Sequence, residues 1–290
     1  SVLLIFCLFS IAAAIVETEY NCSLAREILL PLASASYAND PTACMNSVLP
    51  GAKMNRRFEV PCDSTKNNTC SAYTFVDEPR RIFGLVFRGT NADEQFEVEL
   101  PSLLSTPPMD FANGGKVVPY FNDGFFSLWN ASLGSNVQEM ARQYPDFDLY
   151  ITGHSLGGAM AAISAAHILA SGLIPKDRVL LYTFGQPRIG DAQLASILDS
   201  AVAYRIVHNR DLAPHIPFQS QGYQHHKTQI FYENGMELHA PWVVCKGEED
   251  SNCANKFGVI ETNFGTDHVH YFARNVLTYG SEGCPKITLP

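Results

Sequence analysis

The sequence predicts an α/β fold with a largely parallel central sheet and helices on both faces. Short apolar stretches alternate with helical patterns along most of the chain, which is typical of a doubly wound sheet. Residues 179–184 are apolar without alternation, as in a strand covered on both faces. Residues 156–171 are rich in Ala and Leu, as in a helix. With 290 residues, the chain can bury one large core, so we expect a single domain over residues 15–290.

Composition excludes some classes of function. Charged residues make up 17% of the chain and hydrophobic residues 46%, which is typical of a compact globular protein. The net charge of −9 argues against nucleic-acid binding, which needs clustered Lys and Arg. It also argues against electrostatic docking on anionic membranes, but it does not argue against a neutral lipid surface.

The N-terminal stretch predicts secretion. Residues 1–16 are uncharged and almost wholly apolar, and small residues at 12–14 resemble a cleavage site. We therefore expect residues 1–14 to be a signal peptide, N-terminally incomplete because the basic region is absent. A membrane anchor is the alternative, but sixteen residues are few for a span. Elsewhere no stretch is long and apolar enough to span a bilayer.

Cysteines and sequons agree with an extracellular protein. Seven Cys follow the signal, and in a secreted chain these indicate disulfides. Two pairs would close short polar loops, and a third would join the terminal segments. The pairings that we expect are Cys62–Cys70, Cys245–Cys253 and Cys22–Cys284, with Cys44 unpaired. Three N-x-S/T sequons occur, at Asn21, Asn67 and Asn130, and we expect glycans on the last two, making the chain a glycoprotein.

Periodicity places the other elements. The expected strands are 71–76, 81–87, 146–151, 178–184 and 203–208, with a hairpin over 230–242. The expected helices are 22–38, 124–132, 135–144, 156–171, 191–199 and 267–277. Residues 39–69 are expected to be irregular and residues 117–121 extended.

The most informative motif is Gly153-His154-Ser155-Leu156-Gly157, which lies between a predicted strand and a predicted helix. This context is that of a nucleophile elbow, in which a strained backbone lifts the Ser hydroxyl above the sheet. Side chains two positions before and after the Ser would collide, so both positions are Gly. The helix N-terminus adds positive charge where an oxyanion would form. A Gly-rich turn with Ser155 as a simple N-cap is the alternative.

A nucleophilic Ser needs an acid that orients a His. In hydrolases that carry such an elbow, the acid and then the His follow the Ser along the chain. Asp211 lies in a loop after the strand 203–208, and we expect it to be the acid. The competing residues Asp177, Asp191 and Asp199 lie at ends of helices or strands, where a cap is the simpler role.

We expect His268 to be the catalytic base because it lies at the entry to the last predicted helix, beyond Asp211. His270 is expected to pack or face solvent, and His154 is expected to support the elbow. A tetrahedral intermediate needs two hydrogen-bond donors. The Leu156 N–H is one, and Thr90, in the loop after the strand 81–87, is the other. The alternative for Thr90 is an ordinary N-cap.

Together these segments resemble the class 3 (fungal-type) lipases. The matching segments are VFRGT (86–90), ITGHSLGG (151–158), TFGQPRIG (183–190), DLAP (211–214) and DHVHYF (267–272). The resemblance implies an α/β-hydrolase fold, a Ser155–His268–Asp211 triad, and Thr90 and Leu156 as oxyanion donors. It also implies ester hydrolysis without a metal or organic cofactor, and a disulfide that links the terminal segments.

The segment after Thr90 departs from the family. The family's lid is usually a short amphipathic helix with a Trp, whereas residues 91–100 contain no Trp and alternate like a strand. If this segment is the lid, its residues would be Asn91, Phe96, Val98 and Leu100. So few apolar side chains among four carboxylates give only modest affinity for a lipid surface. A solvated surface segment is the alternative.

The sequence therefore predicts a secreted serine hydrolase of lipid carboxylic esters, and a triacylglycerol lipase acting at an oil–water interface is our first interpretation. An esterase for soluble or phenolic esters (feruloyl-esterase-like) or a phospholipase is the alternative, because one fold serves them all. An inactive secreted lipid- or carbohydrate-binding relative would lack a triad residue, and none is missing.

Overall fold

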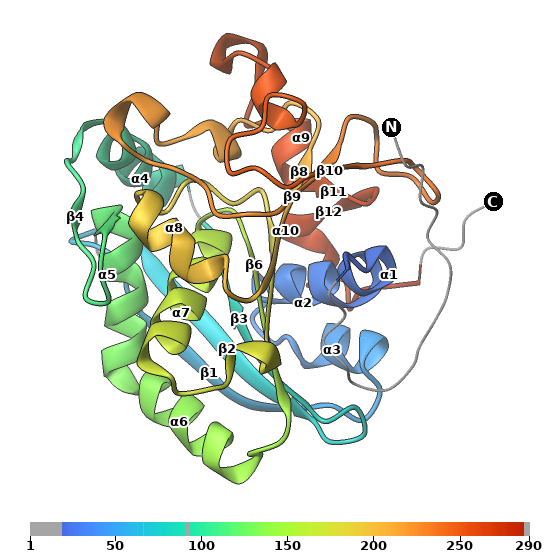
Figure 1. Cartoon of the computed structure of the whole chain (residues 1–290). Coiled ribbons are helices and arrows are strands. Elements are labelled where there is room, and N and C mark those ends of the chain that lie inside the picture. Colours follow the sequence, from blue (N-terminus) through green and yellow to red (C-terminus); the bar gives the residue numbers. More distant parts are fainter. Residues whose placement is uncertain (1–18, 66, 91–92, 287–290) are drawn as a thin grey trace.

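A single twisted sheet forms the centre of the molecule (Figure 1). The computed structural model describes residues 19–65, 67–90 and 93–286. In these residues the eight-stranded sheet has the order β1-β2-β3-β6-β7-β8-β9-β10. Neighbouring strands from β3 to β9 are parallel, whereas β1, β2 and β10 pair antiparallel with their neighbours. The predicted largely parallel sheet is thus confirmed.

In the described residues the sheet consists of eight strands. They are β1 (Lys53–Pro61), β2 (Thr69–Asp77), β3 (Ile82–Phe87), β6 (Asp148–His154), β7 (Val179–Phe184), β8 (Val202–His208), β9 (Gln229–Tyr232) and β10 (Val243–Cys245). Two short antiparallel pairs lie outside it, namely β4 (Met109–Asp110) with β5 (Lys116–Val117) and β11 (His270–Tyr271) with β12 (Arg274–Asn275). All residues of β3 and β7 are buried, as expected for strands covered on both faces.

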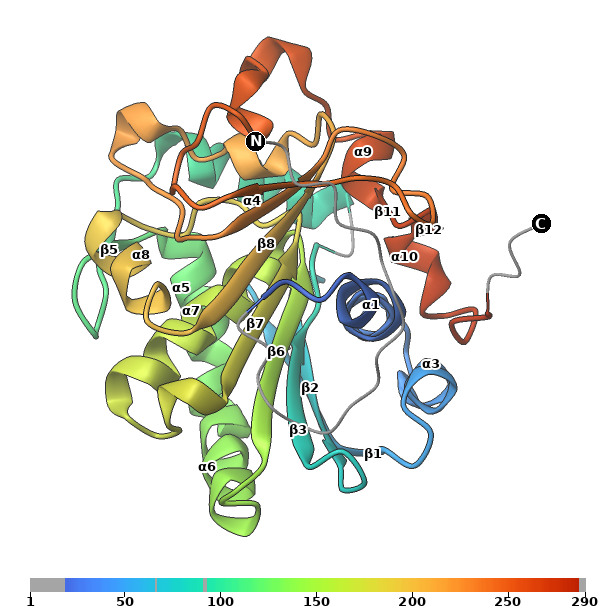
Figure 2. The same ribbon diagram turned by 45° about the vertical axis from the view of Figure 1, so that its right-hand side comes forward.

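Helices cover both faces of the sheet (Figure 2). One layer contains α5 (Pro119–Leu128), α6 (Gly134–Gln143), α7 (Leu156–Ser171) and α8 (Ala192–Leu198). The other contains α1 (Cys22–Leu24), α2 (Leu30–Ala35), α3 (Thr42–Val48) and α10 (Val276–Tyr279). Each layer closes its own apolar core against the sheet. Two further helices, α4 (Asp93–Ser105) and α9 (Thr266–Val269), lie beyond the carboxyl ends of the parallel strands.

The central helix α7 positions the elbow. It is buried almost all round because it lies between the sheet and the outer helices, so its sequence is apolar on every face. It begins directly after Ser155 and ends at Gly172, whose left-handed conformation (φ 66°) stops the helix. The strand β6 before the elbow is held between β3 and β7, which fixes the height at which the chain turns.

Two predictions about secondary structure in the first half of the chain are wrong, the second of them only in part. Residues 39–69 are not irregular, because they form α3 and the edge strand β1. Most of β1 is exposed, so its apolar pattern is weak although its pairing with β2 is extensive. The expectation that residues 117–121 are extended holds only for Val117, in β5, and Val118, because Pro119 begins α5. Pro is favourable at a first helical position.

The predicted C-terminal helix over 267–277 is also wrong. The chain forms α9, then the β11–β12 hairpin, and then α10. The helix cannot continue because Phe272 and Ala273 have positive φ angles of 53° and 59°. This reversal buries the Tyr271 and Phe272 side chains rather than leaving them along one helix face.

The disulfides agree with the predictions only in part. Cys62–Cys70 and Cys245–Cys253 are confirmed. The pairing of Cys22 with Cys284 and the expectation of an unpaired Cys44 are wrong, because Cys44 is bonded to Cys284. Cys44 lies on α3, whose Ser47 hydroxyl donates to the Cys284 carbonyl, and this contact brings the C-terminal segment to α3. Cys22 is also disulfide-bonded.

None of the helices in the described part of the chain is long and apolar enough to cross a bilayer.

The Cys44–Cys284 bridge should stabilise the fold more than the Cys62–Cys70 bridge does. The first joins residues 240 apart and the second residues 8 apart, and longer closed loops restrict the unfolded chain more. We expect Cys44→Ala/Cys284→Ala to lower the free energy of unfolding by about 3–5 kcal/mol and Cys62→Ala/Cys70→Ala by about 2 kcal/mol. Urea titration of both variants measures this, and equal losses would contradict the prediction.

Candidate active site

The elbow has the backbone that the motif predicts. Ser155 has φ 58° and ψ −129°, a conformation that side chains rarely adopt. A Cβ atom added to Gly153 would lie 2.3 Å from the Gly157 carbonyl oxygen, and one added to Gly157 would lie 2.4 Å from the Phe87 carbonyl oxygen. Both glycines are therefore required by the close approach of β3, the elbow and α7. The Ser155 N–H is held by the Phe184 carbonyl at 2.9 Å.

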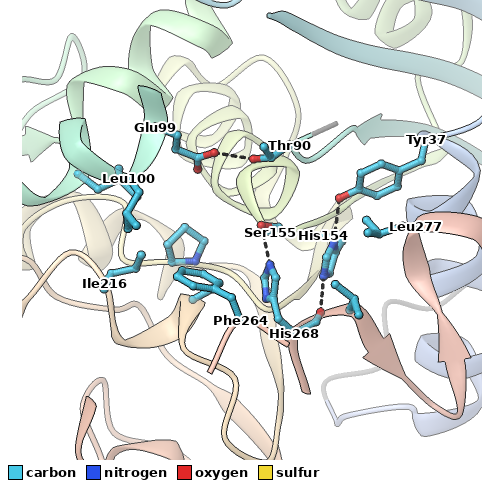
Figure 3. Close-up of a pocket in the computed structure, with 14 residues that line it drawn as sticks. Tyr37, Thr90, Glu99, Leu100, His154, Ser155, Ile216, Phe264, His268 and Leu277 are labelled. Atoms are coloured by element: carbon cyan, nitrogen blue, oxygen red, sulfur yellow. Dashed lines mark hydrogen bonds between the residues drawn. The ribbon is translucent and has the colours of Figure 1, made fainter. Parts of the chain in front are cut away.

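Three of the predicted site residues meet at this elbow. The Ser155 hydroxyl lies 2.9 Å from His268 Nε2 (Figure 3), and His268 Nδ1 lies 2.9 Å from Asp211 Oδ1. His268 comes from α9 and Asp211 from the loop after β8, so two separate segments bring them to Ser155. This arrangement can pass the Ser155 proton to the imidazole while the carboxylate fixes the other ring nitrogen.

The Asp211 carboxylate is fully buried but well satisfied. Besides His268, its Oδ1 accepts the Ala213 N–H at 2.8 Å, and its Oδ2 accepts the Tyr271 hydroxyl at 2.6 Å. Burial alone would raise the pKa of Asp211, but the attraction of His268 and these hydrogen bonds hold that pKa below its ordinary value. Asp211 is therefore ionised and fixed beside the His268 ring.

His154 supports the same constellation from the other side (Figure 3). Its Nε2 lies 2.8 Å from the His268 carbonyl oxygen, which can only accept, so this nitrogen carries the proton. Its Nδ1 then accepts the Tyr37 hydroxyl at 2.8 Å. Burial, together with the proximity of His268, lowers the pKa of His154 to about 3. A neutral His154 thus fixes the backbone that carries the candidate base.

The two residues predicted to bind the oxyanion, Leu156 and Thr90, lie close to Ser155. Leu156 is the first residue of α7, so its N–H points toward the elbow from a helix N-terminus. Thr90 follows β3 and lines the same cavity as Ser155. Its hydroxyl donates to Glu99 Oε2 at 2.5 Å, and Glu99 comes from α4 (Figure 3).

Glu99 is a carboxyl group buried over the site. Only 5% of it is exposed, and burial raises its pKa to about 7 although the Thr90 hydrogen bond and His268 both act to lower it. The side chain therefore changes charge near neutral pH while it faces the residue expected to bind an oxyanion.

The segment expected to be the lid is a helix, which corrects the strand-like interpretation of its alternating pattern. The helix α4 contains this segment from Asp93 onward, because strong helix formers such as Glu, Gln and Leu outweigh the alternation. Asn91 lies outside the described residues, and the side chains of Phe96 and Val98 do too. Leu100 lines the cavity beside Ser155, so α4 covers the site.

A cavity of about 290 Å³ opens over Ser155, which is at the small end for a ligand pocket. Its lining is mostly apolar, with the candidate catalytic groups on its floor (Figure 3). The apolar lining residues are Leu100, Leu103, Pro187, Ala213, Ile216, Phe264, Val269 and Leu277. The cavity can hold an acyl chain next to the nucleophile. The described residues contain no cluster of three or more His, Cys, Asp or Glu side chains that could hold a metal ion.

Sequence reasoning missed four residues of this site: Tyr37, Glu99, Phe264 and Tyr271. Tyr271 follows His268 by three residues, so its position beside a proposed triad residue could have drawn attention to it. Tyr37 and Phe264 come from segments with no recognisable motif, and in the sequence Glu99 is one of several acidic residues after Thr90. Tyr37 and Tyr271 contribute through contacts with residues distant in sequence, whereas Glu99 and Phe264 contact residues nearer along the chain.

Comparison with known proteins decides the family. The profile of the class 3 lipases matches residues 84–221. The lipase ZK262.3 of Caenorhabditis elegans is 32% identical over 308 aligned positions, which cover 94% of this chain and 85% of that protein. The chain belongs to the class 3 lipase family. The present chain is also 30% identical to the lipase of Rhizomucor miehei, in an alignment that covers 79% of this chain and 64% of that relative.

A solved structure supports the same assignment. A fungal lipase in complex with an inhibitor matches this lipase with a TM-score of 0.74 and 25% identity, covering 86% of this chain and 93% of the other. The fold is therefore the α/β-hydrolase fold, as the sequence predicted. The enzyme is a serine lipase, a carboxylic ester hydrolase of lipids.

Glu99 should make the stability of the enzyme depend on pH. The folded chain protonates this carboxyl near pH 7 and the unfolded chain near its ordinary value of 4.5. The folded state thus binds more protons in between, so this contribution to stability is lost as pH rises through that window. Between pH 5 and pH 8 this group should lower the unfolding free energy of the parent by on the order of 2 kcal/mol. Glu99→Gln should remove that part of the pH dependence. Urea titrations at both pH values measure this, and an unchanged difference would contradict it.

Proposed function

We propose that this lipase hydrolyses acylglycerols through an acyl-enzyme formed on Ser155. The Ser155 hydroxyl attacks the ester carbonyl while His268 takes its proton, and His268 then gives that proton to the leaving alcohol. Asp211 holds the His268 ring and stabilises its charged form. A water molecule, deprotonated in turn by His268, attacks the acyl-enzyme and releases the fatty acid.

The observation that carries this proposal is the unbroken hydrogen-bonded series from Ser155 through His268 to a buried, ionised Asp211. Ser155 and His268 line an apolar cavity. The negative oxygen of each tetrahedral intermediate would lie near the Leu156 N–H and Thr90, at the positive end of α7. The apolar lining suits an acyl chain better than a polar or phenolic acid. A neutral acylglycerol also suits a chain with a net charge of −9.

The helix α4 supports action at an oil–water interface. In its present position it buries Glu99 against Thr90 and limits the cavity to about 290 Å³, so a long acyl chain requires α4 to move. The solved relative was studied as a model for interfacial activation in lipases. We therefore propose that an oil surface favours the displaced position of α4.

We also propose that the enzyme acts outside the cell. Disulfides such as Cys44–Cys284 persist in oxidising compartments. The proposed signal peptide, residues 1–14, lies outside the described residues, and a single domain would follow from residue 15. Among the sequons, Asn67 and Asn130 are exposed and open to glycosylation. Asn21 instead caps α1 through its side chain.

Hydrolysis of tributyrin across its solubility limit tests the proposed activity. We expect a rise in rate above the limit, and Ser155→Ala should lower the rate at every concentration by about 10³-fold or more because the nucleophile is lost. A fluorophosphonate probe should label the unmodified enzyme and not the variant. A smooth saturating curve would favour an esterase for soluble esters, and the absence of Ser155-dependent turnover would overturn the proposal.

The two neighbouring histidines should behave differently. His268→Ala removes the proposed base and should lower kcat on tributyrin by about 10³-fold or more. His270→Ala is the matched control, because the His270 ring is hydrogen-bonded to the Thr266 carbonyl at 3.1 Å and is not among the residues that line the cavity. This variant should keep most of its turnover. Equal losses in two folded variants, as judged by circular dichroism, would contradict the assignment of the base.

A further inference from the structure

An exposed aliphatic side chain projects from the segment before α9. Ile260 is 98% exposed, whereas the other exposed large hydrophobic residues in the described chain are only 36–41% exposed. Its neighbour Val259 is one of them, at 40%, and Gly258 before it is exposed too. Residues 258–260, here called the apolar tip, thus present aliphatic surface to water.

The apolar tip is a defined turn. The Glu261 N–H donates to the Gly258 carbonyl at 2.8 Å, and the Glu261 carboxylate accepts the Gly258 N–H at 2.8 Å. The Thr262 hydroxyl donates to the Val259 carbonyl at 2.6 Å. Because these bonds close the turn on itself, the exposure of Ile260 follows from the local fold.

The segment behind the apolar tip is attached firmly to the body of the enzyme. The Cys245–Cys253 bridge closes its base, and the Arg188 guanidinium holds Glu249 through two bonds of 2.8 Å. Phe257, directly before the tip, packs on Phe231 and lies under the Arg210 guanidinium, which is 4.6 Å from the ring centre. The tip is therefore presented by a rigid support.

The apolar tip lies at the same end of the molecule as the mouth of the active site. Four residues beyond Ile260, Phe264 lines the cavity over Ser155. The orange-red segment that carries the tip projects at the top of Figures 1 and 2, on the side where α4 and α9 lie. On the α4 side Leu104, 41% exposed, is held to the neighbouring segment by a bond from Gln221 to its carbonyl.

We infer that the apolar tip is a fixed docking element that inserts into a neutral acylglycerol surface and places the cavity mouth against it. This inference rests on the proposed function. The occupant is a neutral surface, because the chain carries a net charge of −9 and the tip is flanked by one cation and one anion, Lys256 and Glu261. Because these flanking charges balance, the aliphatic side chains would enter uncharged lipid through the burial of apolar area alone.

The role of the apolar tip differs from that of α4. The helix α4 covers the cavity and must move, whereas the tip already stands in water and needs no rearrangement. It therefore supplies affinity for oil before the site opens, which compensates for the few apolar side chains available on the covering helix.

Binding without turnover tests this inference. We would place Ile260→Ser in the Ser155→Ala background and measure flotation with triolein droplets coated with phosphatidylcholine. Losing the Ile260 side chain, which the inference places in the lipid, should lower the partition coefficient between droplet and water about tenfold. Met54→Ser is the control: Met54 is 36% exposed but is the second residue of β1, at the opposite end of the sheet from the site. This variant should bind as the parent does. Circular dichroism verifies folding.

In the active enzyme, Ile260→Ser should also lower the ratio of tributyrin hydrolysis above the solubility limit to that below it. Unchanged partitioning by Ile260→Ser would overturn the inference, as would a loss confined to droplets containing anionic phosphatidylglycerol. A loss of self-association in size-exclusion chromatography, with droplet binding intact, would assign the tip to a second copy of the chain. Failure of the proposed function would instead appear as no hydrolysis of dissolved tributyrin, with droplet binding unaffected.

Discussion

The close approach of three backbones at the elbow determines the rest of the site. Gly153 and Gly157 allow β3, β6 and α7 to come together, and Ser155 takes a rare positive φ as a result. With Ser155, the proposed nucleophile, fixed to the centre of the sheet, the other proposed catalytic groups must be brought to it. The loop after β8 and the segment at α9 do so by packing onto the carboxyl ends of the strands. The sheet thus defines one point, and the loops converge on it.

A buried carboxylate is the second constraint. Asp211 is stable in the interior only because His268, Tyr271 and a backbone N–H all donate to it. The contact with Asp211 also orients the His268 ring, so one set of bonds both stabilises the buried charge and fixes the proposed base. Glu99 shows the opposite case, a buried carboxyl with one hydroxyl donor and a raised pKa.

The parts of the fold that repeat a local pattern could be predicted from the sequence. The sheet core and the elbow have clear periodicity, and the order of Ser155, Asp211 and His268 follows from the way such chains wind. The failures have physical causes. The edge strand β1 lacks an apolar pattern because it is exposed, and positive φ angles at Phe272 and Ala273 are invisible in the residue types. Contacts such as Glu99 with Thr90 depend on tertiary packing alone.

The attachment of the C-terminal segment has a consequence for synthesis. The candidate base and Tyr271 belong to a segment that is joined to α3 by Cys44–Cys284 and packs so tightly on α2 that a Cβ at Gly280 would lie 2.3 Å from the Ser34 backbone. Because His268 follows Ser155 by 113 residues, a nascent chain contains the elbow well before it contains the candidate base. Until then the proposed nucleophile lacks its proposed base. If His268 is the base, we expect the chain to be inactive towards lipid until the segment at α9 has docked beside the elbow.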